Sequence, residues 1–300
     1  MKECRYYRCL EGGAVECQLC PHHCHIADGK TGRCRSRRNY GGILLSEVYA
    51  RPCSLAIDPI EKKPLYHFHP GTQCLSLACT GCNFRCLNCQ NHDISQISPS
   101  DVPHYDLSPE ALVALCQKHH CPGIAYTYTE PLTYLEYITD CARLAHESGL
   151  WNILVTAGYV CPQPLKDLLP YLDAANIDLK SFSDDIYMRV SGGHLQPVLD
   201  TIVAMHEAGV WLEITNLLIP GVNDDMDMIR QMCSWLREHH LTMSSARIGP
   251  RRGLGSKKRG SAPLPIHGIS KITLKVVVFH FRRFRLPLIL HLSSHFTKSD

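Results

Sequence analysis

The 300-residue sequence lacks any apolar run long enough to span a bilayer, and its first residues, Met1 to Tyr7, contain no apolar core. A secretory signal peptide needs such a core between its charged start and its cleavage site. The two absences exclude a membrane-spanning segment and predict that the protein is not exported. We therefore expect a cytoplasmic protein, kept in a reducing environment.

Acidic residues are almost missing from the last 60 positions. Residues 241–300 contain 12 Lys and Arg but only one acidic residue, Asp300, whereas residues 1–240 contain 27 acidic and 19 basic residues. A basic tail of this kind can bind nucleic acid or a membrane surface. Alternatively, residues 241–300 are an out-of-frame or disordered product, because they lack the charge balance of a globular protein. We favour the second interpretation and expect no nucleic-acid partner.

Cysteine, by contrast, is abundant, with 17 residues, five of which lie between Cys74 and Cys89. Disulfides between cysteines spaced this closely are geometrically awkward. Clustered cysteines in a protein without a secretory signal are typical of metal ligation.

Strand and helix patterns alternate between residues 75 and 240. Short apolar runs predict five strands, over 75–78, 124–127, 152–156, 175–179 and 211–219. Amphipathic periodicity and helix-capping residues predict helices between and after them, over 109–119, 131–148, 163–171, 197–208 and 224–239. This order predicts parallel strands with right-handed crossovers, hence an α/β fold built as a partial (β/α) barrel. In such barrels the chemistry lies at the carboxyl ends of the strands.

Three segments follow from these patterns: a Cys-rich N-terminal extension over 1–70, a core over 71–240 and a divergent tail over 241–300. Within the core, Cys82, Cys86 and Cys89 are spaced C-x3-C-x2-C directly after the first strand. Three thiolates this close can hold three corners of a cubane iron–sulfur cluster and leave one iron open, whereas four would close it. Free thiols and a zinc site from the pairs Cys79–Cys82 and Cys86–Cys89 are the alternatives.

The stretch C-N-F-R-C-L-N-C-Q-N at 82–91 resembles the motif of the radical S-adenosylmethionine superfamily. The segments 58–68 (D-P-I-E-K-K-P-L-Y-H-F), 126–131 (Y-T-Y-T-E-P) and 176–180 (N-I-D-L-K) sharpen the match. Together with the Cys-rich N-terminus, they resemble the radical enzyme of the AmmeMemoRadiSam system, a group similar to pyruvate formate-lyase activating enzymes. The resemblance covers about residues 5–240.

The resemblance implies a [4Fe-4S] cluster on the Cys82 triad, with S-adenosylmethionine on its open iron. Reductive cleavage of that cofactor gives a 5′-deoxyadenosyl radical, which takes a hydrogen atom from a substrate. A one-electron donor such as flavodoxin or ferredoxin is implied, and Memo-like and AMMECR-like proteins are possible partners. The closest rival is a glycyl-radical-enzyme activating enzyme, and a rival of another class is a zinc-binding nucleic-acid module.

The resemblance also implies which residues bind the cofactor. Glu130 follows the second strand and matches the position that binds the amino group, for which a carboxylate is a suitable acceptor. Asp178 and Lys180 match the positions that bind the ribose and carboxylate. Thr156 and Asn216, near the ends of the third and fifth strands, are further candidates. The alternatives are a surface acid at a helix start for Glu130, an exposed ion pair for Asp178 and Lys180, and core or turn roles for the other two.

Two features depart from the family pattern. Asn88 stands where many members carry an aromatic residue before the last cysteine of the motif. After residue 240, nothing matches the sixth strand and the His/Arg-containing segment of the family. This leaves open whether the cofactor pocket is complete and whether the chain is active.

A second cysteine group lies in the N-terminal extension, where Cys17, Cys20, Cys24 and Cys34 are spaced C-x2-C-x3-C-x9-C. Four thiols can close a zinc site or hold an auxiliary iron–sulfur cluster, and free thiols are the alternative. We favour zinc, because a short segment needs a staple to fold. Three histidines offer alternative ligands: His22, His23 and His25. The cysteines that occur singly are predicted to be core thiols: Cys116, Cys121, Cys141, Cys161 and Cys233.

Overall fold

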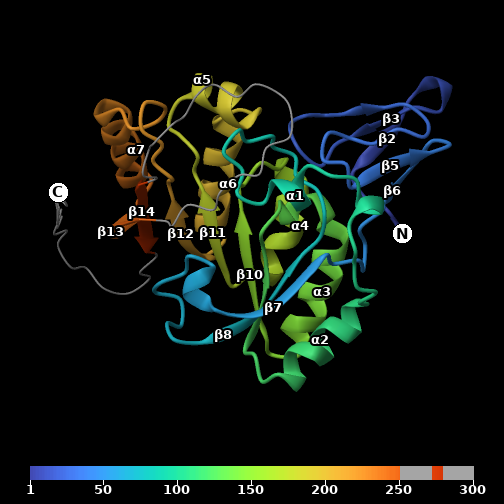
Figure 1. Ribbon diagram of the computed structural model, residues 1–300, viewed down its shortest axis with the longest axis horizontal. Coiled ribbons are helices and arrows are strands. Elements are labelled where there is room, and N and C mark those ends of the chain that lie inside the picture. Colours follow the sequence, from blue (N-terminus) through green and yellow to red (C-terminus); the bar gives the residue numbers. More distant parts are fainter. Residues whose placement is uncertain (251–271, 280–300) are drawn as a thin grey trace, which may run out of the picture.

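The computed structural model describes residues 1–250 and 272–279, with strands 242–250 and 272–279 given by their backbone (Figure 1). A six-stranded sheet in the order β12-β11-β10-β9-β8-β7 forms its centre. Its strands are β7 (Ser54–Pro59), β8 (Gln73–Ala78), β9 (Gly123–Tyr126), β10 (Trp151–Thr156), β11 (Ala174–Asp178) and β12 (Trp211–Thr215). Strands β8 to β12 are parallel, as predicted, whereas β7 pairs antiparallel with β8 at the edge.

Helices follow the parallel strands and pack on the outer face of the sheet, where Figure 1 shows α2, α3 and α4 side by side. The longer helices are α2 (Pro109–Lys118), α3 (Leu135–Glu147), α4 (Pro162–Leu168), α6 (Gln196–Glu207) and α7 (Met226–Glu238), and the shorter ones are α1 (His92–Ser95) and α5 (Asp184–Ile186). Ser108 caps α2 by accepting from Ala111 N, and Asp225 caps α7 by accepting from Met228 N. The predicted α/β partial barrel is confirmed.

Two predicted boundaries differ most from the structure. The helix expected from residue 131 begins as a 3-10 turn over Pro131–Tyr134, because Glu130 caps the backbone there before the α-helix starts. The strand expected to reach residue 219 ends at Thr215, because the next side chain, Asn216, donates to the Leu179 carbonyl oxygen at 2.6 Å and the chain turns away from the sheet.

The inner face of the sheet is filled at its amino-terminal end by residues 60–68. Ile60, Leu65 and Phe68 pack there against Ala125 and Ile153, which point inward from β9 and β10. Glu213 on β12 holds the backbone of this segment: its carboxylate accepts from Tyr66 N at 2.7 Å and from His67 N at 2.9 Å. The floor of the barrel is therefore closed, and its chemistry is confined to the carboxyl ends of the strands.

The first 46 residues form two small three-stranded sheets, in the orders β1-β6-β5 and β2-β3-β4, which lie together at one side of the molecule (Figure 1). Their strands are β1 (Lys2–Glu3), β2 (Tyr7–Cys9), β3 (Val15–Cys17), β4 (His25–Ile26), β5 (Arg37–Tyr40) and β6 (Ile43–Ser46). A fully buried ion pair between Arg37 and Glu136 of α3, with 2.6 Å between Nη2 and Oε2, joins these sheets to the core. The division into three segments stays a prediction; β7, which falls within residues 1–70, belongs to the central sheet.

Beyond α7, β13 (Thr242–Pro250) and β14 (Ile272–Phe279) pair antiparallel in a separate two-stranded sheet. Among the described residues, no parallel sixth strand follows α7. The basic run at 251–260 lies outside the described residues, so the predicted tail interactions remain predictions. None of the described helices combines the length and apolarity that crossing a membrane requires.

Candidate functional site

The Cys82 triad lies on the loop that leaves β8 at the carboxyl end of the sheet. This loop, which we call the cluster loop, comprises residues 82–89. Its three cysteines are partly exposed free thiols. Burial raises the pKa of Cys82, with the nearby Glu130 carboxylate adding to the shift, while at Cys86 burial raises the pKa and the Lys180 ammonium opposes it. The structure therefore brings the triad beside residues that follow the second and fourth parallel strands.

The cluster loop is held by a segment that the sequence did not indicate. Arg85 N donates to Ser191 O at 2.9 Å and Leu87 N to Val190 O at 3.0 Å, both on the π-helical turn Tyr187–Ser191. Just after this turn, a Cβ on Gly193 would lie 2.4 Å from the Phe84 ring, so only glycine allows the approach. The Gly192-Gly193 pair is the signal in the sequence that could have indicated this contact.

Glu130 is buried, with 1% of its surface exposed, and is not the surface acid of the alternative interpretation. Its Oε1 accepts from Thr156 Oγ1 at 2.6 Å and Leu132 N at 3.1 Å, and its Oε2 accepts from Ala157 N at 2.8 Å. Burial nevertheless raises the pKa of the carboxyl group, because these donors offset only part of the lost hydration. The Glu130 backbone N also donates to Gly81 O at 3.3 Å, which links this residue to the start of the cluster loop.

Asp178 and Lys180 lie at and just beyond the end of β11 and pair with each other, with 2.6 Å between Lys180 Nζ and Asp178 Oδ2. Their side chains are 38% and 28% exposed, so part of the pair faces solvent. Burial alone would lower the pKa of Lys180, but the Asp178 carboxylate more than offsets it and the pKa is raised. Asp178 and Lys180 therefore form an ion pair that stands beside the cluster loop.

Asn216 acts on the backbone rather than on an open surface. It is buried, and its Nδ2 donates to Leu179 O, one residue before Lys180. Two residues that sequence analysis missed fix Lys180 itself: Tyr187 OH accepts from its backbone N at 2.9 Å, and Asn223 Nδ2 donates to its carbonyl oxygen at 2.7 Å. Tyr187 lies seven positions from Lys180 and Asn223 lies 43 positions away, so neither contact follows from helix or strand periodicity.

The alternative of a zinc site at the triad needs the pair Cys79–Cys82, and the structure separates Cys79 from the other ligands. Cys79 is fully buried in the helix-covered core, and the ionisable thiols beside it are Cys53 and Cys141. Within the described residues, no three His, Cys, Asp or Glu side chains stand at the spacing of a single-ion site. A four-iron cluster places its thiolates on different irons, so they need not converge on one point. Soft thiolates on one loop, with a carboxylate and an ammonium group beside them, fit such a cluster and an amino-acid cofactor.

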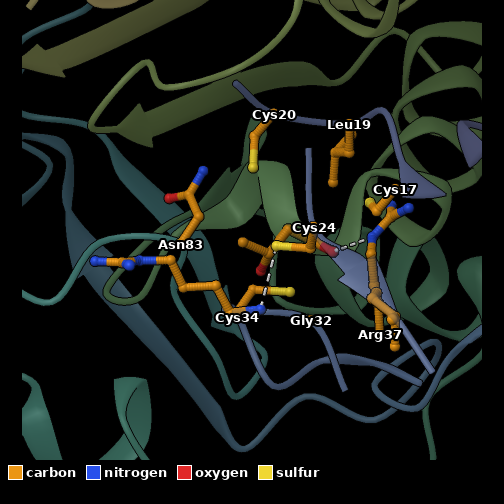
Figure 2. Close-up of a pocket in the computed structure, with 11 residues that line it drawn as sticks. Cys17, Leu19, Cys20, Cys24, Gly32, Cys34, Arg37 and Asn83 are labelled. Atoms are coloured by element: carbon orange, nitrogen blue, oxygen red, sulfur yellow. Dashed lines mark hydrogen bonds between the residues drawn. The ribbon is translucent and has the colours of Figure 1, made fainter. Parts of the chain in front are cut away.

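The four N-terminal cysteines line one cavity, together with Arg37 and Asn83 (Figure 2). The three predicted alternative ligands are engaged elsewhere: His22 Nε2 lies 2.9 Å from Asn83 O, His25 Nε2 lies 2.8 Å from Glu16 Oε2, and His23 Nε2 lies 4.0 Å from Cys161 Sγ. Of the predicted core thiols, Cys116, Cys121 and Cys141 are buried, whereas Cys161 and Cys233 are only partly buried.

Comparison with known proteins identifies the family. The family model of the Radical SAM superfamily matches residues 77–233. The uncharacterized protein MJ0808 of Methanocaldococcus jannaschii is 45% identical over 238 residues, which cover 79% of this chain and 71% of that protein. The pyruvate formate-lyase-activating enzyme of Clostridium pasteurianum is 24% identical over 163 residues, 52% of this chain and 66% of that enzyme. A solved radical SAM methyltransferase from Sphaerobacter thermophilus aligns with a TM-score of 0.46 at 14% identity, over 79% of this chain and 63% of that one.

The chain belongs to the radical S-adenosylmethionine superfamily. It is an enzyme of that type, and membership implies a [4Fe-4S] cluster and S-adenosylmethionine as cofactors.

Proposed function

We propose that this chain is the radical enzyme of an AmmeMemoRadiSam system. When bound, the cluster and S-adenosylmethionine supply a 5′-deoxyadenosyl radical that abstracts a hydrogen atom from a substrate. The radical chemistry is supported by the position of the cluster loop, which starts against Glu130 and lies beside Asp178 and Lys180, at the carboxyl ends of β9 and β11. The assignment to this system is supported by segments 58–68, 126–131 and 176–180 together with the Cys-rich N-terminus.

The residues divide into ligands, cofactor contacts and positioning residues. Cys82, Cys86 and Cys89 would hold the cluster through their thiolates. Asp178 and Lys180, partly exposed, would bind the ribose and carboxylate of S-adenosylmethionine. Glu130 would accept from its amino group through Oε2, which takes only one hydrogen bond among the described residues.

Thr156 and Asn216 are further candidate contacts to the cofactor, and their hydrogen bonds also support the contacts above. Thr156 orients the Glu130 carboxylate, and Asn216 fixes the Leu179 carbonyl beside Lys180. Both side chains are as buried as that of Glu130, and Asn216 Oδ1 makes no hydrogen bond among the described residues, so it could accept one from the cofactor.

The proposal includes partners and a second cofactor. A one-electron donor such as flavodoxin or ferredoxin would reduce the cluster, and Memo-like and AMMECR-like proteins would act in the same system. Cys17, Cys20, Cys24 and Cys34 would hold zinc or an auxiliary iron–sulfur cluster, because they line one cavity. A reducing, cytoplasmic location suits 17 cysteines that are all free thiols.

A second candidate function is activation of a glycyl-radical enzyme, whose substrate is a glycine on a partner protein. The similarity to the pyruvate formate-lyase-activating enzyme of Clostridium pasteurianum favours it. A glycyl radical detected by electron paramagnetic resonance on a co-purified partner would establish this second function and reject the first.

The cluster assignment is tested by anaerobic reconstitution of the full chain with iron and sulfide. We expect a brown protein that releases 5′-deoxyadenosine when given dithionite and S-adenosylmethionine. Cys86→Ala should lose the triad iron and this activity. The matched control is Cys233→Ala, a partly buried single thiol on α7, which should keep both. Equal triad iron in the two variants would overturn the assignment.

A further inference from the structure

The surface around the cluster loop carries a group of arginines that no carboxylate neutralises. Arg85 belongs to the loop and is exposed, while Arg33 and Arg35 belong to the N-terminal extension and are partly exposed. Within the part of the chain that the structure describes, none of these arginines forms an ion pair. The exposed acids of the neighbouring segments, Asp93 and Asp184, lie beside histidines instead. The surface is therefore positive, although residues 1–240 contain 27 acidic and 19 basic residues.

Two of these arginines are anchored on adjacent peptide units. Arg33 Nη2 donates to Gly192 O at 3.1 Å. Arg85 N donates at 2.9 Å to the carbonyl oxygen of the preceding residue, Ser191. The N-terminal extension and the cluster loop thus place their cations on the same short stretch of chain.

The third arginine is joined to the cluster loop through an amide side chain. Arg35 Nη1 donates to Gln96 Oε1 at 2.8 Å, and Gln96 Nε2 donates to Phe84 O, also at 2.8 Å. Phe84 directly precedes Arg85 in the chain. Three like charges held this closely repel one another, so an acidic partner would be attracted to the group.

Exposed apolar side chains stand on the same surface. Leu87, between Cys86 and Cys89, is 76% exposed, and Met188 is 46% exposed. Leu87 N donates to Val190 O at 3.0 Å, which places Leu87 beside the turn that carries Met188. Protein–protein interfaces are enriched in Met and Arg, so this combination favours a protein as the partner.

The extent of the positive surface also favours a protein over a nucleic acid. A protein that binds duplex DNA typically neutralises about 6–10 phosphates with Lys and Arg. The arginines here are fewer and lie on an acidic body. Weak redox encounters, by contrast, use small surfaces and are steered by complementary charge. Leu87 lies between two of the proposed cluster ligands, so a protein that docks here comes close to the cluster.

We propose that Arg33, Arg35 and Arg85, together with Leu87 and Met188, form the docking surface for an acidic one-electron carrier protein. The N-terminal extension then has a part in reduction, because it supplies two of the cations. On docking, one electron passes from the carrier to the cluster: the carrier is oxidised, the cluster is reduced, and no bond forms or breaks. The electron-transfer role rests on the proposed function, whereas the docking surface is tested by binding alone.

Calorimetric titration of the reconstituted full chain with a flavodoxin of net negative charge, and separately with an acidic ferredoxin, tests the surface. We expect one of the two carriers to bind, with an affinity that falls as salt is added. Arg85→Glu should weaken this binding about tenfold at low salt, since it reverses a charge that faces the carrier. Lys118→Glu is the matched control: it makes the same change of charge at an exposed position at the end of α2, which precedes the start of β9.

Equal affinity of the two variants for the carrier would overturn the docking surface, and so would the failure of both carriers to bind the unchanged protein. A short single-stranded RNA that binds in place of the carriers, and binds less tightly to Arg85→Glu, would assign the surface to nucleic acid and also overturn the proposal.

The role in reduction has its own measurement, the rate at which the absorbance of the cluster is lost on anaerobic mixing. The reduced carrier should react about tenfold more slowly with Arg85→Glu than with Lys118→Glu, whereas dithionite, which needs no docking surface, should reduce both alike. Equal rates with the carrier would show that docking at this surface does not deliver the electron. Absence of triad iron from the unchanged protein would refute the proposed function instead, and the binding titration would still decide the surface.

Discussion

The Thr156 hydroxyl donates to the buried Glu130 carboxylate at 2.6 Å, joining the end of β10 to the residue beyond β9. This bond orients a carboxylate that stands against the start of the cluster loop. The hydrogen bond thus links two residues that are 26 positions apart in the chain, and its contribution to the free energy of unfolding can be measured.

Thr156→Val should lower the free energy of unfolding by about 1–3 kcal/mol, because a buried carboxylate oxygen loses a donor. Urea denaturation of the reconstituted enzyme measures the change. Thr139→Val is the control: that hydroxyl donates to Leu135 O within α3, where an i−4 carbonyl already has a backbone partner. Its effect should stay within about 0.5 kcal/mol.

The affinity for S-adenosylmethionine should fall as pH is lowered through the pKa of Glu130. Burial raises that pKa, and a protonated carboxyl group cannot balance the ammonium group of the cofactor. Thr156 opposes the shift, so in Thr156→Val the loss of affinity should begin at higher pH. Calorimetric titration at several pH values in both proteins measures this. Identical pH profiles in the two proteins would show that protonation of Glu130 does not control cofactor binding.

Lys180→Met should weaken S-adenosylmethionine binding by about 10- to 100-fold, the value of a charge-assisted hydrogen bond, without changing triad iron. The reason is that Lys180 supplies the ammonium group beside Cys86. Lys166→Met, on the exposed face of α4, serves as the control and should bind as the unchanged enzyme does. A Lys180 variant with unchanged affinity would assign this residue to the ion pair with Asp178 alone.

Lys62 and Lys63 both pair with Asp58 but differ in burial, so mutating each in turn compares an exposed ion pair with a buried one. Both donate to Asp58, at 2.6 and 2.7 Å, but Lys62 is 57% exposed and Lys63 is fully buried. Lys63→Met should destabilise the protein by about 3 kcal/mol, because it leaves a buried carboxylate short of its cation. Lys62→Met should cost less than about 1 kcal/mol, as exposed pairs do.

The pH dependence of this difference follows from the pKa of Asp58. Burial raises that pKa, but hydrogen bonds from Lys62, Lys63 and Tyr128 hold it well below its usual range. A depressed pKa contributes stability above the unfolded value, about 3.9, and the contribution is lost as pH falls through the folded pKa. Since Lys63→Met raises the folded pKa, its deficit in unfolding free energy should shrink below that new pKa. A deficit that is constant with pH would exclude the ion pair as its cause.

Glu213→Gln tests the closed floor of the barrel. An amide has one acceptor oxygen where Glu213 offers two to Tyr66 N and His67 N, so its NH2 would face a backbone donor. We expect a loss of about 2 kcal/mol and faster amide exchange at these two residues. Glu207→Gln, at an exposed position at the end of α6, should change neither. Unchanged exchange in Glu213→Gln would show that apolar packing alone holds the segment.

The sequence by itself determined the parts of this protein that are written in local spacing. The C-x3-C-x2-C triad, the alternation of strands and helices, and the strand-end positions of Glu130 and Asp178 follow from neighbouring residues, because thiolate reach and side-chain period act over a few positions. The caps of α2 and α7 are local for the same reason.

Only the tertiary structure decided which distant segments meet. It closed the barrel with residues 60–68, added β7 at the edge, pinned the cluster loop on Tyr187–Ser191 and gathered the four N-terminal cysteines against Asn83. It also buried Glu130, which the sequence left open to either a surface or a site role. These outcomes depend on contacts between residues far apart in the chain, and such contacts produce no periodic pattern in the sequence.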